Sequence, residues 1–254
     1  MNFKNINAII SGAGSGLGLA TARLIIQNGG KVIALDLNHS GVDKELYAND
    51  NFIFLANDVT DEEKTRSNIK YSFDNFTNIS LVVNCAGIGM PSKVLTKDGT
   101  HSGELFKKII EVNLVGSFNV LKLAAEKMQN NKNDKDGFRG LIINTASIAA
   151  FDGQIGQSAY SASKGGIVGI TLPIARELAR YGIRVCTIAP GLFETPMLQG
   201  LPEKAHQSLI DSTLYPKRLG KPSEYAQLVK SIYENNMLNG ETIRLDGSLR
   251  LAPK

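Results

Sequence analysis

A cluster of glycines near the amino terminus constrains the fold of this chain more than any other feature. Residues 11–18 read SGAGSGLG and lie between a short apolar run, residues 6–10, and an apolar-periodic segment, residues 17–27. This order predicts a strand, a tight turn and a helix. Glycines let a phosphate group approach the helix N-terminus closely, where free amide groups and the helix dipole favour an anion. The turn therefore predicts a dinucleotide site in a parallel α/β sheet.

The glycine spacing and the acid that follows it select the type of dinucleotide. Gly12, Gly16 and Gly18 are separated by three residues and then by one, so the segment does not fit G-x-G-x-x-G. Asp36 ends the next predicted strand, residues 31–36. A carboxylate there accepts both ribose hydroxyls of NAD and repels the additional phosphate of NADP. The alternative interpretation of Asp36 is a solvated loop residue.

A serine, a tyrosine and a lysine near the middle of the chain form the predicted catalytic group. Ser147 follows a predicted strand, Tyr160 lies thirteen residues later, and Lys164 lies four residues after that. The spacing of four puts Tyr160 and Lys164 on one face of a helix, where the ammonium favours the phenolate. Ser147 would donate a hydrogen bond to a substrate oxygen. A Tyr-x-x-x-Lys pair is a weak signal alone, and the upstream dinucleotide site gives it weight.

The rest of the chain alternates between strand and helix patterns. Thr60 followed by Glu63 is typical of a capping box, so the acids beside them are assigned to a helix start. The long helical pattern at 103–128 contains Asn113, a poor interior helix residue. The seven predicted strands are 6–10, 31–36, 52–56, 81–84, 141–145, 184–189 and 241–245. The predicted helices are 17–27, one from the capping box to about 73, 103–128, one through Lys164 to about 180, and 223–234.

Residues 192–222 lack strand periodicity but carry several large apolar side chains. Such an insertion beside a ligand crevice is typical of a substrate lid, which we expect at about 192–215. Core packing is the alternative.

Composition excludes several other classes of protein. The formal charge of +4 is spread over 254 residues without a basic run, which gives no support to nucleic-acid binding. Cys85 and Cys186 lack any Cys/His metal spacing, so we expect reduced, buried thiols and no metal site. No secretory signal or stretch of eighteen apolar residues is present, so we expect a cytoplasmic protein that does not enter a membrane.

In this order, the motifs resemble those of the short-chain dehydrogenase/reductase family, and the resemblance covers the whole chain. The segments NCAG at 84–87 and PG at 190–191 are similar to further motifs of that family. The resemblance implies a single domain, residues 1–254, with a Rossmann-type, doubly wound, seven-stranded parallel sheet and helices on both faces. It also implies a homotetramer. Ser11 and Ser248 depart from the family pattern, where threonine and glycine are commoner.

Longer segments, among them VNCAGIG and TIAPGLFETPML, are similar to the type II 3-hydroxyacyl-CoA dehydrogenase subgroup, some members of which also oxidise hydroxysteroids. This likeness implies NAD as cofactor and the interconversion of 3-hydroxyacyl-CoA and 3-oxoacyl-CoA in fatty acid metabolism. The cofactor contacts that it implies are Gly12, Ser15, Gly16, Leu17, Gly18, Asp36, Asp58, Val59, Asn84, Cys85, Ala86, Gly87, Tyr160, Lys164, Pro190, Phe193 and Thr195.

The resemblance also implies a role for each catalytic residue. Tyr160 would exchange a proton with the substrate oxygen, which Ser147 would hold and polarise. Lys164 would lower the pKa of the tyrosine and bind the nicotinamide ribose. Asn113 would position a water that relays the proton to solvent. Gln154 would touch the substrate together with Ser147 and Tyr160.

Three other functions are compatible with the same fold. A 3-oxoacyl-carrier-protein reductase usually uses NADPH and often has arginine in the glycine turn, so Ser15 and Asp36 argue against it. A small-alcohol or polyol dehydrogenase fits poorly with the apolar segment at 192–215. A catalytically silent NAD-binding scaffold subunit usually lacks the tyrosine or the lysine, and this chain has both.

Overall fold

Seven parallel strands form one sheet in the computed structural model, which describes residues 2–97, 99–196, 207 and 210–253. The strand order is β3-β2-β1-β4-β7-β8-β9. The order reverses between β1 and β4, so the carboxyl ends of these strands border the crevice where open α/β sheets bind ligands. The predicted doubly wound sheet is confirmed. The strands are β1 (Asn7–Ser11), β2 (Lys31–Asp36), β3 (Phe52–Ala56), β4 (Ile79–Asn84), β7 (Gly140–Thr145), β8 (Ile183–Pro190) and β9 (Thr242–Leu245).

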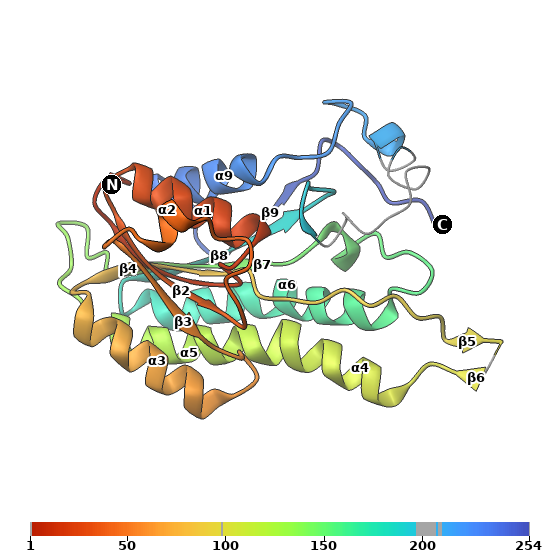
Figure 1. Cartoon of the computed structure of the whole chain (residues 1–254), viewed down its shortest axis with the longest axis horizontal. Helices are drawn as coiled ribbons and strands as arrows, with labels where there is room; N and C mark the ends of the chain where they lie inside the picture. Colours follow the sequence, from red (N-terminus) through yellow and green to blue (C-terminus); the bar gives the residue numbers. More distant parts are fainter. Residues whose placement is uncertain (1, 98, 197–206, 208–209, 254) are drawn as a thin grey trace.

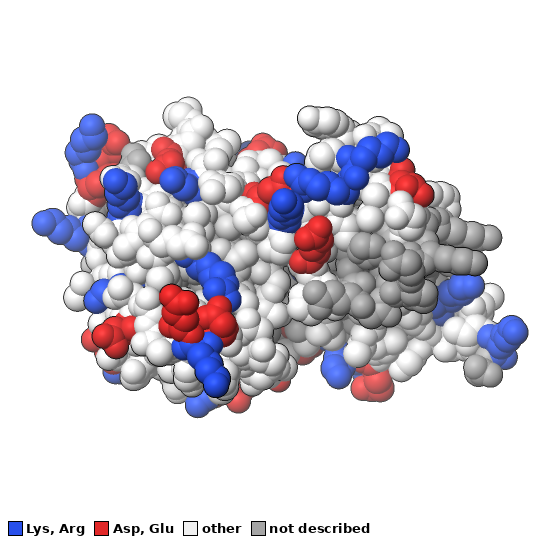
Figure 2. Space-filling view, turned by 45° about the horizontal axis from the view of Figure 1, so that its top comes forward, with Lys and Arg blue, Asp and Glu red and all other residues white. Residues whose placement is uncertain are grey.

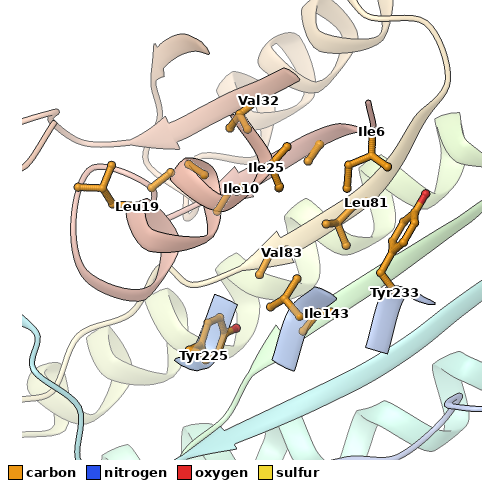
Figure 3. Packing of buried hydrophobic residues seen from close by; sticks show 14 of the residues in the cluster. Ile6, Ile10, Leu19, Ile25, Val32, Leu81, Val83, Ile143, Tyr225 and Tyr233 are labelled. Carbon is orange, nitrogen blue, oxygen red and sulfur yellow. The ribbon is translucent and has the colours of Figure 1, made fainter. Parts of the chain in front are cut away.

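Helices cover both faces of this sheet (Figure 1). Strand residues alternate between the faces, so neighbours in sequence join different clusters. On β1, Ile10 packs with Ile25 of α1, whereas Ile9 packs with Ile69 of α3. Figure 3 shows part of the first cluster. One face carries α1 (Gly16–Gln27) and α9 (Pro222–Glu234), and the other carries α3 (Glu62–Asn75), α5 (Ser117–Met128) and α6 (Ser158–Ala179).

The long helix predicted at 103–128 is present but is not a continuous α-helix. It consists of α4 (Gly103–Ile110), a π-helical segment (Glu111–Gly116) and α5. Asn113 lies inside the π-helical segment and is fully buried. Its side chain bonds to the chain that follows β4. A local π-bulge of this kind is frequent at functional sites, and the sequence signal for it was the interior asparagine.

The predicted capping box at the start of α3 is wrong. Asp61 is the N-cap residue, and its carboxylate accepts a hydrogen bond from the Lys64 amide at 2.9 Å. Thr60 instead donates both its amide and its hydroxyl to Asp58. The Asp61 carboxylate, one residue later, satisfies the helix amide, and the bonds of Thr60 to Asp58 hold the threonine in the preceding turn.

Several short elements were not predicted. The helix α2 (Lys44–Tyr47) follows β2, and β5 (Leu95–Thr96) and β6 (Gly99–Thr100) form a two-stranded antiparallel ribbon. The ribbon extends away from the main sheet, at the right of Figure 1. Elements of two to four residues are too short to show a hydrophobic period.

The surface carries mixed charge and a few exposed apolar side chains. Acidic and basic groups are interspersed over the face in Figure 2. On the face of the sheet that α3, α5 and α6 cover, Phe118 of α5 and Leu172 of α6 are 41% and 43% exposed. None of the helices in the described ranges combines the length and apolarity needed to cross a membrane.

Candidate active site

The glycine turn packs tightly against the chain that follows β4. A Cβ atom on Gly12, which has φ +70°, would lie 2.5 Å from the Ala86 amide nitrogen. A Cβ on Gly14 would lie 2.1 Å from the Asn38 carbonyl oxygen. Ser15 is the N-cap residue of α1, but its side chain makes no capping hydrogen bond. The amides at the start of α1 therefore have no side-chain acceptor, as a phosphate site requires.

Asp36 is turned toward this glycine turn. One carboxylate oxygen accepts a hydrogen bond from the Gly14 amide at 2.8 Å, and the other accepts one from the Leu37 amide at 2.7 Å. Both bonds hold the acid at the carboxyl end of β2, beside the turn. This is the position that the sequence predicts for a carboxylate that binds a ribose.

The predicted contacts after β3 and β4 differ in exposure. Val59 is buried and Asp58 bonds to Thr60, so both belong to a compact turn. Asn84 is 1% exposed and bonds to Ser11, Asn144 and Ser117, so it ties β1, β4 and β7 together. Cys85, Ala86 and Gly87 follow it, all partly exposed. Cys186 is buried as predicted, whereas Cys85 is partly exposed as a residue, although its thiol bonds to Thr145 and Tyr225 inside the fold, and both cysteines are free.

The side chain of Asn113 holds Ile88, the residue that follows Gly87, through two hydrogen bonds. Its carboxamide oxygen accepts from the Ile88 amide at 2.8 Å, and its nitrogen donates to the Ile88 carbonyl at 3.0 Å. The same nitrogen donates to Ser163 of α6, whose hydroxyl donates to the Tyr160 carbonyl. The side chain thus joins the loop after β4 to the helix that carries Tyr160.

Ser147, Tyr160 and Lys164 converge at the carboxyl end of β7. Ser147 is the N-cap residue of a 3-10 helix (Ile148–Ala150) directly after that strand. Lys164 is 4% exposed, donates to the Thr145 carbonyl at 2.8 Å and has its ammonium 5.8 Å from the centre of the Tyr160 ring. A Cβ on Gly87 would lie 3.4 Å from the same ammonium nitrogen, so these residues border the crevice.

Burial dominates the electrostatics of the group. It lowers the pKa of Lys164 from 10.5 to about 8, against a smaller opposing influence of Cys85. Burial raises the pKa of Tyr160, and a hydrogen bond with Ser147 partly offsets this. The expectation that Lys164 lowers the pKa of Tyr160 is not met in this arrangement, where burial is the larger influence on the phenol.

The segment after β8 returns toward the glycine turn. Pro190 ends β8, and Thr195 lies with its methyl group 3.4 Å from where a Cβ on Gly16 would be. Phe193 is 5% exposed, and its ring packs on Gly220. Within the lid predicted at about 192–215, residues 197–206 and 208–209 lie outside the described residues.

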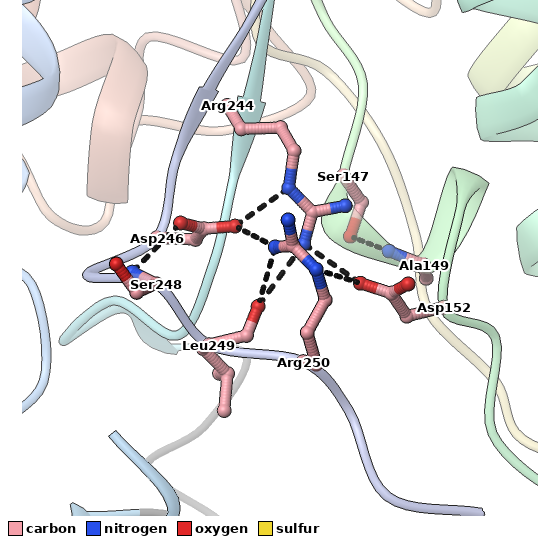
Figure 4. A network of polar contacts seen from close by, with 8 residues as sticks. All are labelled: Ser147, Ala149, Asp152, Arg244, Asp246, Ser248, Leu249 and Arg250. Atoms are coloured by element: carbon pink, nitrogen blue, oxygen red, sulfur yellow. Dashed lines mark hydrogen bonds and ion pairs between the residues drawn. The ribbon is translucent and has the colours of Figure 1, made fainter. Parts of the chain in front are cut away.

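The predicted substrate residue Gln154 lies in a loop tied to the carboxyl-terminal tail. Its amide nitrogen donates to the Ala252 carbonyl at 3.0 Å. Arg244 of β9 pairs with Asp152 and with Asp246, each at 2.7 Å (Figure 4). Figure 4 also shows Ser147 at the start of the same loop. The tail therefore fixes one wall of the site.

Three residues of the site, Thr145, Ser163 and Tyr225, were not predicted from the sequence. The Thr145 carbonyl accepts a hydrogen bond from the Lys164 ammonium, and the Ser163 hydroxyl connects Asn113 to α6. The buried hydroxyl of Tyr225 bonds to the Thr145 hydroxyl at 2.7 Å. Threonine, serine and tyrosine are common in strands and helices, and nothing in their spacing marks them. Within the described ranges, no three acidic, histidine or cysteine side chains are grouped to hold a metal ion.

Comparison with known proteins agrees with this geometry. The sequence model described as short chain dehydrogenase matches residues 6–206. The chain is 51% identical over 253 residues to 3-hydroxyacyl-CoA dehydrogenase type-2 of Homo sapiens, covering 98% of this chain and 97% of that protein. The homologue in Drosophila melanogaster is also 51% identical, over 98% and 99% of the two chains.

A solved structure and a second enzyme class extend the comparison. The crystal structure of 3-hydroxyacyl-CoA dehydrogenase type-2 from Mycobacterium avium superposes with a TM-score of 0.93 at 35% identity, covering 99% of this chain and 98% of that one. A 3-oxoacyl-[acyl-carrier-protein] reductase of Thermotoga maritima is 34% identical over 98% of this chain and 99% of its own length. The chain is thus more similar to the acyl-CoA enzymes than to this reductase.

Proposed function

Because the chain belongs to the short-chain dehydrogenase family, it is an oxidoreductase, and we propose that it uses NAD to interconvert 3-hydroxyacyl-CoA and 3-oxoacyl-CoA. The family implies a nicotinamide cofactor. The relatives at 51% identity carry the acyl-CoA name, which supports the substrate. One observation carries the chemistry: Ser147, Tyr160 and the buried Lys164 meet at the carboxyl end of β7, beside Gly87.

The residues of the glycine turn fit a dinucleotide. Added Cβ atoms at Gly12 and Gly14 would collide with backbone, so the chain can follow this course only with glycine there. The turn and the start of α1, Ser15 to Gly18, would hold the pyrophosphate, and Asp36 would hold the adenosine ribose. Asp58, Val59 and the segment 84–87 would line the adenine and nicotinamide ends, with Pro190, Phe193 and Thr195 on the opposite side. An acid at Asp36 favours NAD over NADP.

The protein groups supply proton transfer and orientation. When bound, the nicotinamide accepts or returns a hydride. In the oxidative direction, Tyr160 takes the hydroxyl proton of the substrate, and Ser147 donates a hydrogen bond to the substrate oxygen. Lys164 holds its proton near the phenol and would also bind the nicotinamide ribose. Asn113, whose side chain is held by Ile88 and Ser163, would position a water that carries the proton from Lys164 to solvent.

Other parts of the proposal concern the substrate and the assembly. Gln154 and the lid at about 192–215 would contact the acyl chain within a single domain, residues 1–254. The exposed Phe118 and Leu172 support assembly into a homotetramer, since apolar side chains of this size are favourable in an interface. We place the enzyme in the cytoplasm and in fatty acid metabolism.

The test is the rate of NADH oxidation by purified protein with acetoacetyl-CoA. The matched assays replace NADH by NADPH, and the CoA ester by a carrier-protein thioester. Rapid turnover of the CoA ester that is specific for NADH is the expected result. Turnover only with NADPH and the carrier-protein substrate would assign the chain to the reductases instead, and absence of turnover with either thioester would contradict the proposed substrate.

A further inference from the structure

Thr145, whose carbonyl accepts the Lys164 ammonium, also contacts a buried tyrosine from a distant part of the chain. Tyr225 lies on α9, 61 positions after Lys164, and is 0% exposed. Its ring packs in the core cluster that contains Val83 and Ile143 (Figure 3). Its hydroxyl alone reaches polar groups, at the point where β4 and β7 end.

These polar groups form a closed ring of three hydrogen bonds. The Thr145 hydroxyl donates to the Cys85 sulfur at 3.5 Å, and the Cys85 thiol donates to the Tyr225 oxygen at 3.6 Å. The third side, between Tyr225 and Thr145, is 2.7 Å long. Each group has one hydrogen, so the tyrosine donates to the threonine, and every member donates once and accepts once.

Burial keeps the ring uncharged. It raises the pKa of the Cys85 thiol and raises that of Tyr225 well above its ordinary value. Two members of this neutral ring, Thr145 and Cys85, therefore lie beside the buried ammonium of Lys164. Because the ring is neutral and its hydrogen bonds are all made within it, it leaves the Thr145 carbonyl as the acceptor for the Lys164 ammonium.

We infer that Tyr225 is a positioning residue of the active site, whose hydroxyl fixes the two strand ends that hold Lys164 and border the cofactor crevice. On the β7 side, the ring fixes Thr145, whose carbonyl accepts the ammonium. On the β4 side, it fixes Cys85 in the turn that packs on the glycine turn. The inference rests on the proposed function in taking Lys164 as the group that acts with Tyr160.

The chain offers a matched control for the test. Tyr233 lies on the same helix, is 5% exposed, and bonds through its hydroxyl to Ser80 at 2.8 Å. Ser80 lies near the amino end of β4, whereas Thr145 is the last residue of β7. Tyr233 therefore makes its bond at the amino ends of the parallel strands, and Tyr225 makes its bond at their carboxyl ends. Tyr225→Phe and Tyr233→Phe each remove one buried hydroxyl from one helix.

The first readout is the rate at which iodoacetamide alkylates Cys85 in the folded protein, followed by peptide mass spectrometry. Tyr225→Phe should raise this rate about fivefold, the factor that one lost hydrogen bond of ordinary strength produces in a local opening. Tyr233→Phe should leave it unchanged. This readout needs neither cofactor nor substrate, so it stands even if the proposed substrate is wrong.

The second readout is kinetic. Tyr225→Phe should lower kcat about fivefold and weaken NADH binding in a fluorescence titration, with the KM for acetoacetyl-CoA unchanged, because Lys164 and not the substrate loses its support. Thr145→Val breaks the same ring and retains the carbonyl, and it replaces Tyr225→Phe if that variant does not fold. Alkylation and kcat equal to wild type in the ring variants would overturn the inference and leave Tyr225 as a core residue.

Discussion

At the scale of the single residue, burial shifts the pKa values of Tyr160 and Lys164 in opposite directions. Burial raises the pKa of Tyr160, so the phenol holds its proton. Burial lowers the pKa of Lys164 to about 8, so its ammonium is close to releasing one. These shifts move two ordinary values that are nearly equal, 10.0 and 10.5, apart, so Lys164 becomes the member of the pair that titrates nearer to neutral pH.

Tyr160→Phe removes the proposed acid and base while keeping the ring. We expect kcat to fall by about a hundredfold or more, the usual contribution of general acid–base catalysis, with NADH binding retained. Steady-state kinetics and a fluorescence titration measure the two effects. The half-exposed Tyr47 provides the control variant, Tyr47→Phe, which should keep wild-type kinetics. Wild-type turnover by Tyr160→Phe would end the proposed mechanism.

Lys164 makes stability depend on pH in a defined window. Its pKa is about 8 in the fold against 10.5 as the ordinary value, so between these values the unfolded chain holds a proton that the folded chain has released. The free energy of unfolding of the wild type, relative to Lys164→Met, should therefore rise from pH 8 to 10.5. The rise is up to about 3 kcal/mol, and below pH 8 the difference is constant. Urea denaturation across this range measures it, and a difference that does not change with pH would contradict the burial of the charge.

At the scale of the element, the π-helical segment decides how three parts of the chain meet. It places the Asn113 side chain against Ile88 after β4 and against Ser163 of α6. A regular α-helix over 103–128 would satisfy the periodicity of the sequence equally well. The sequence therefore predicted a helix and an unusual residue within it, but not the π turn that accommodates that residue.

Asn113→Ala should lower the free energy of unfolding by about 2 kcal/mol, because the partly buried amide and carbonyl of Ile88 lose their partners. Asn75→Ala is the control, because the side-chain amide of Asn75 also donates to a backbone carbonyl, that of Tyr71, but on the surface. That variant should change stability by less than about 0.5 kcal/mol. Equal effects of the two changes, measured by thermal or urea unfolding, would show that the buried clamp contributes nothing special.

At the scale of the whole molecule, contacts distant in sequence close the site. Arg244 reaches Asp152 across 92 positions, and Gln154 reaches Ala252 across 98. These contacts join the last strand and the tail to the loop that begins at Ser147 (Figure 4). The carboxyl-terminal residues therefore belong structurally to the site.

Arg244→Gln should lower the free energy of unfolding by about 2 kcal/mol, since it breaks charge-assisted bonds to two carboxylates that are 23% and 9% exposed. It should also raise the KM for the acyl substrate by loosening the loop. Arg250→Gln is the control in the same network, because that side chain is 64% exposed and its ion pairs are longer. It should cost less than about 1 kcal/mol. If Arg244→Gln leaves the KM unchanged, this network of ion pairs does not affect substrate binding.

The sequence by itself determined the strands of the main sheet, and it predicts a catalytic group of Ser147, Tyr160 and Lys164. Short apolar runs located all seven strands of the sheet, because a buried parallel strand is apolar on both faces. The glycine turn and Asp36 are local features, and their spacing was sufficient to place a dinucleotide site at the end of the first two strands.

Only the tertiary structure decided how the catalytic residues are held. The Thr145 carbonyl, the Ser163 hydroxyl and Tyr225 act through contacts between residues that are distant in sequence, and common residue types leave no pattern for such contacts. The same holds for the pKa of Tyr160, which depends on burial by other elements. A spacing of four put a tyrosine and a lysine on one helix face, but packing set the distance between them and the protons they hold.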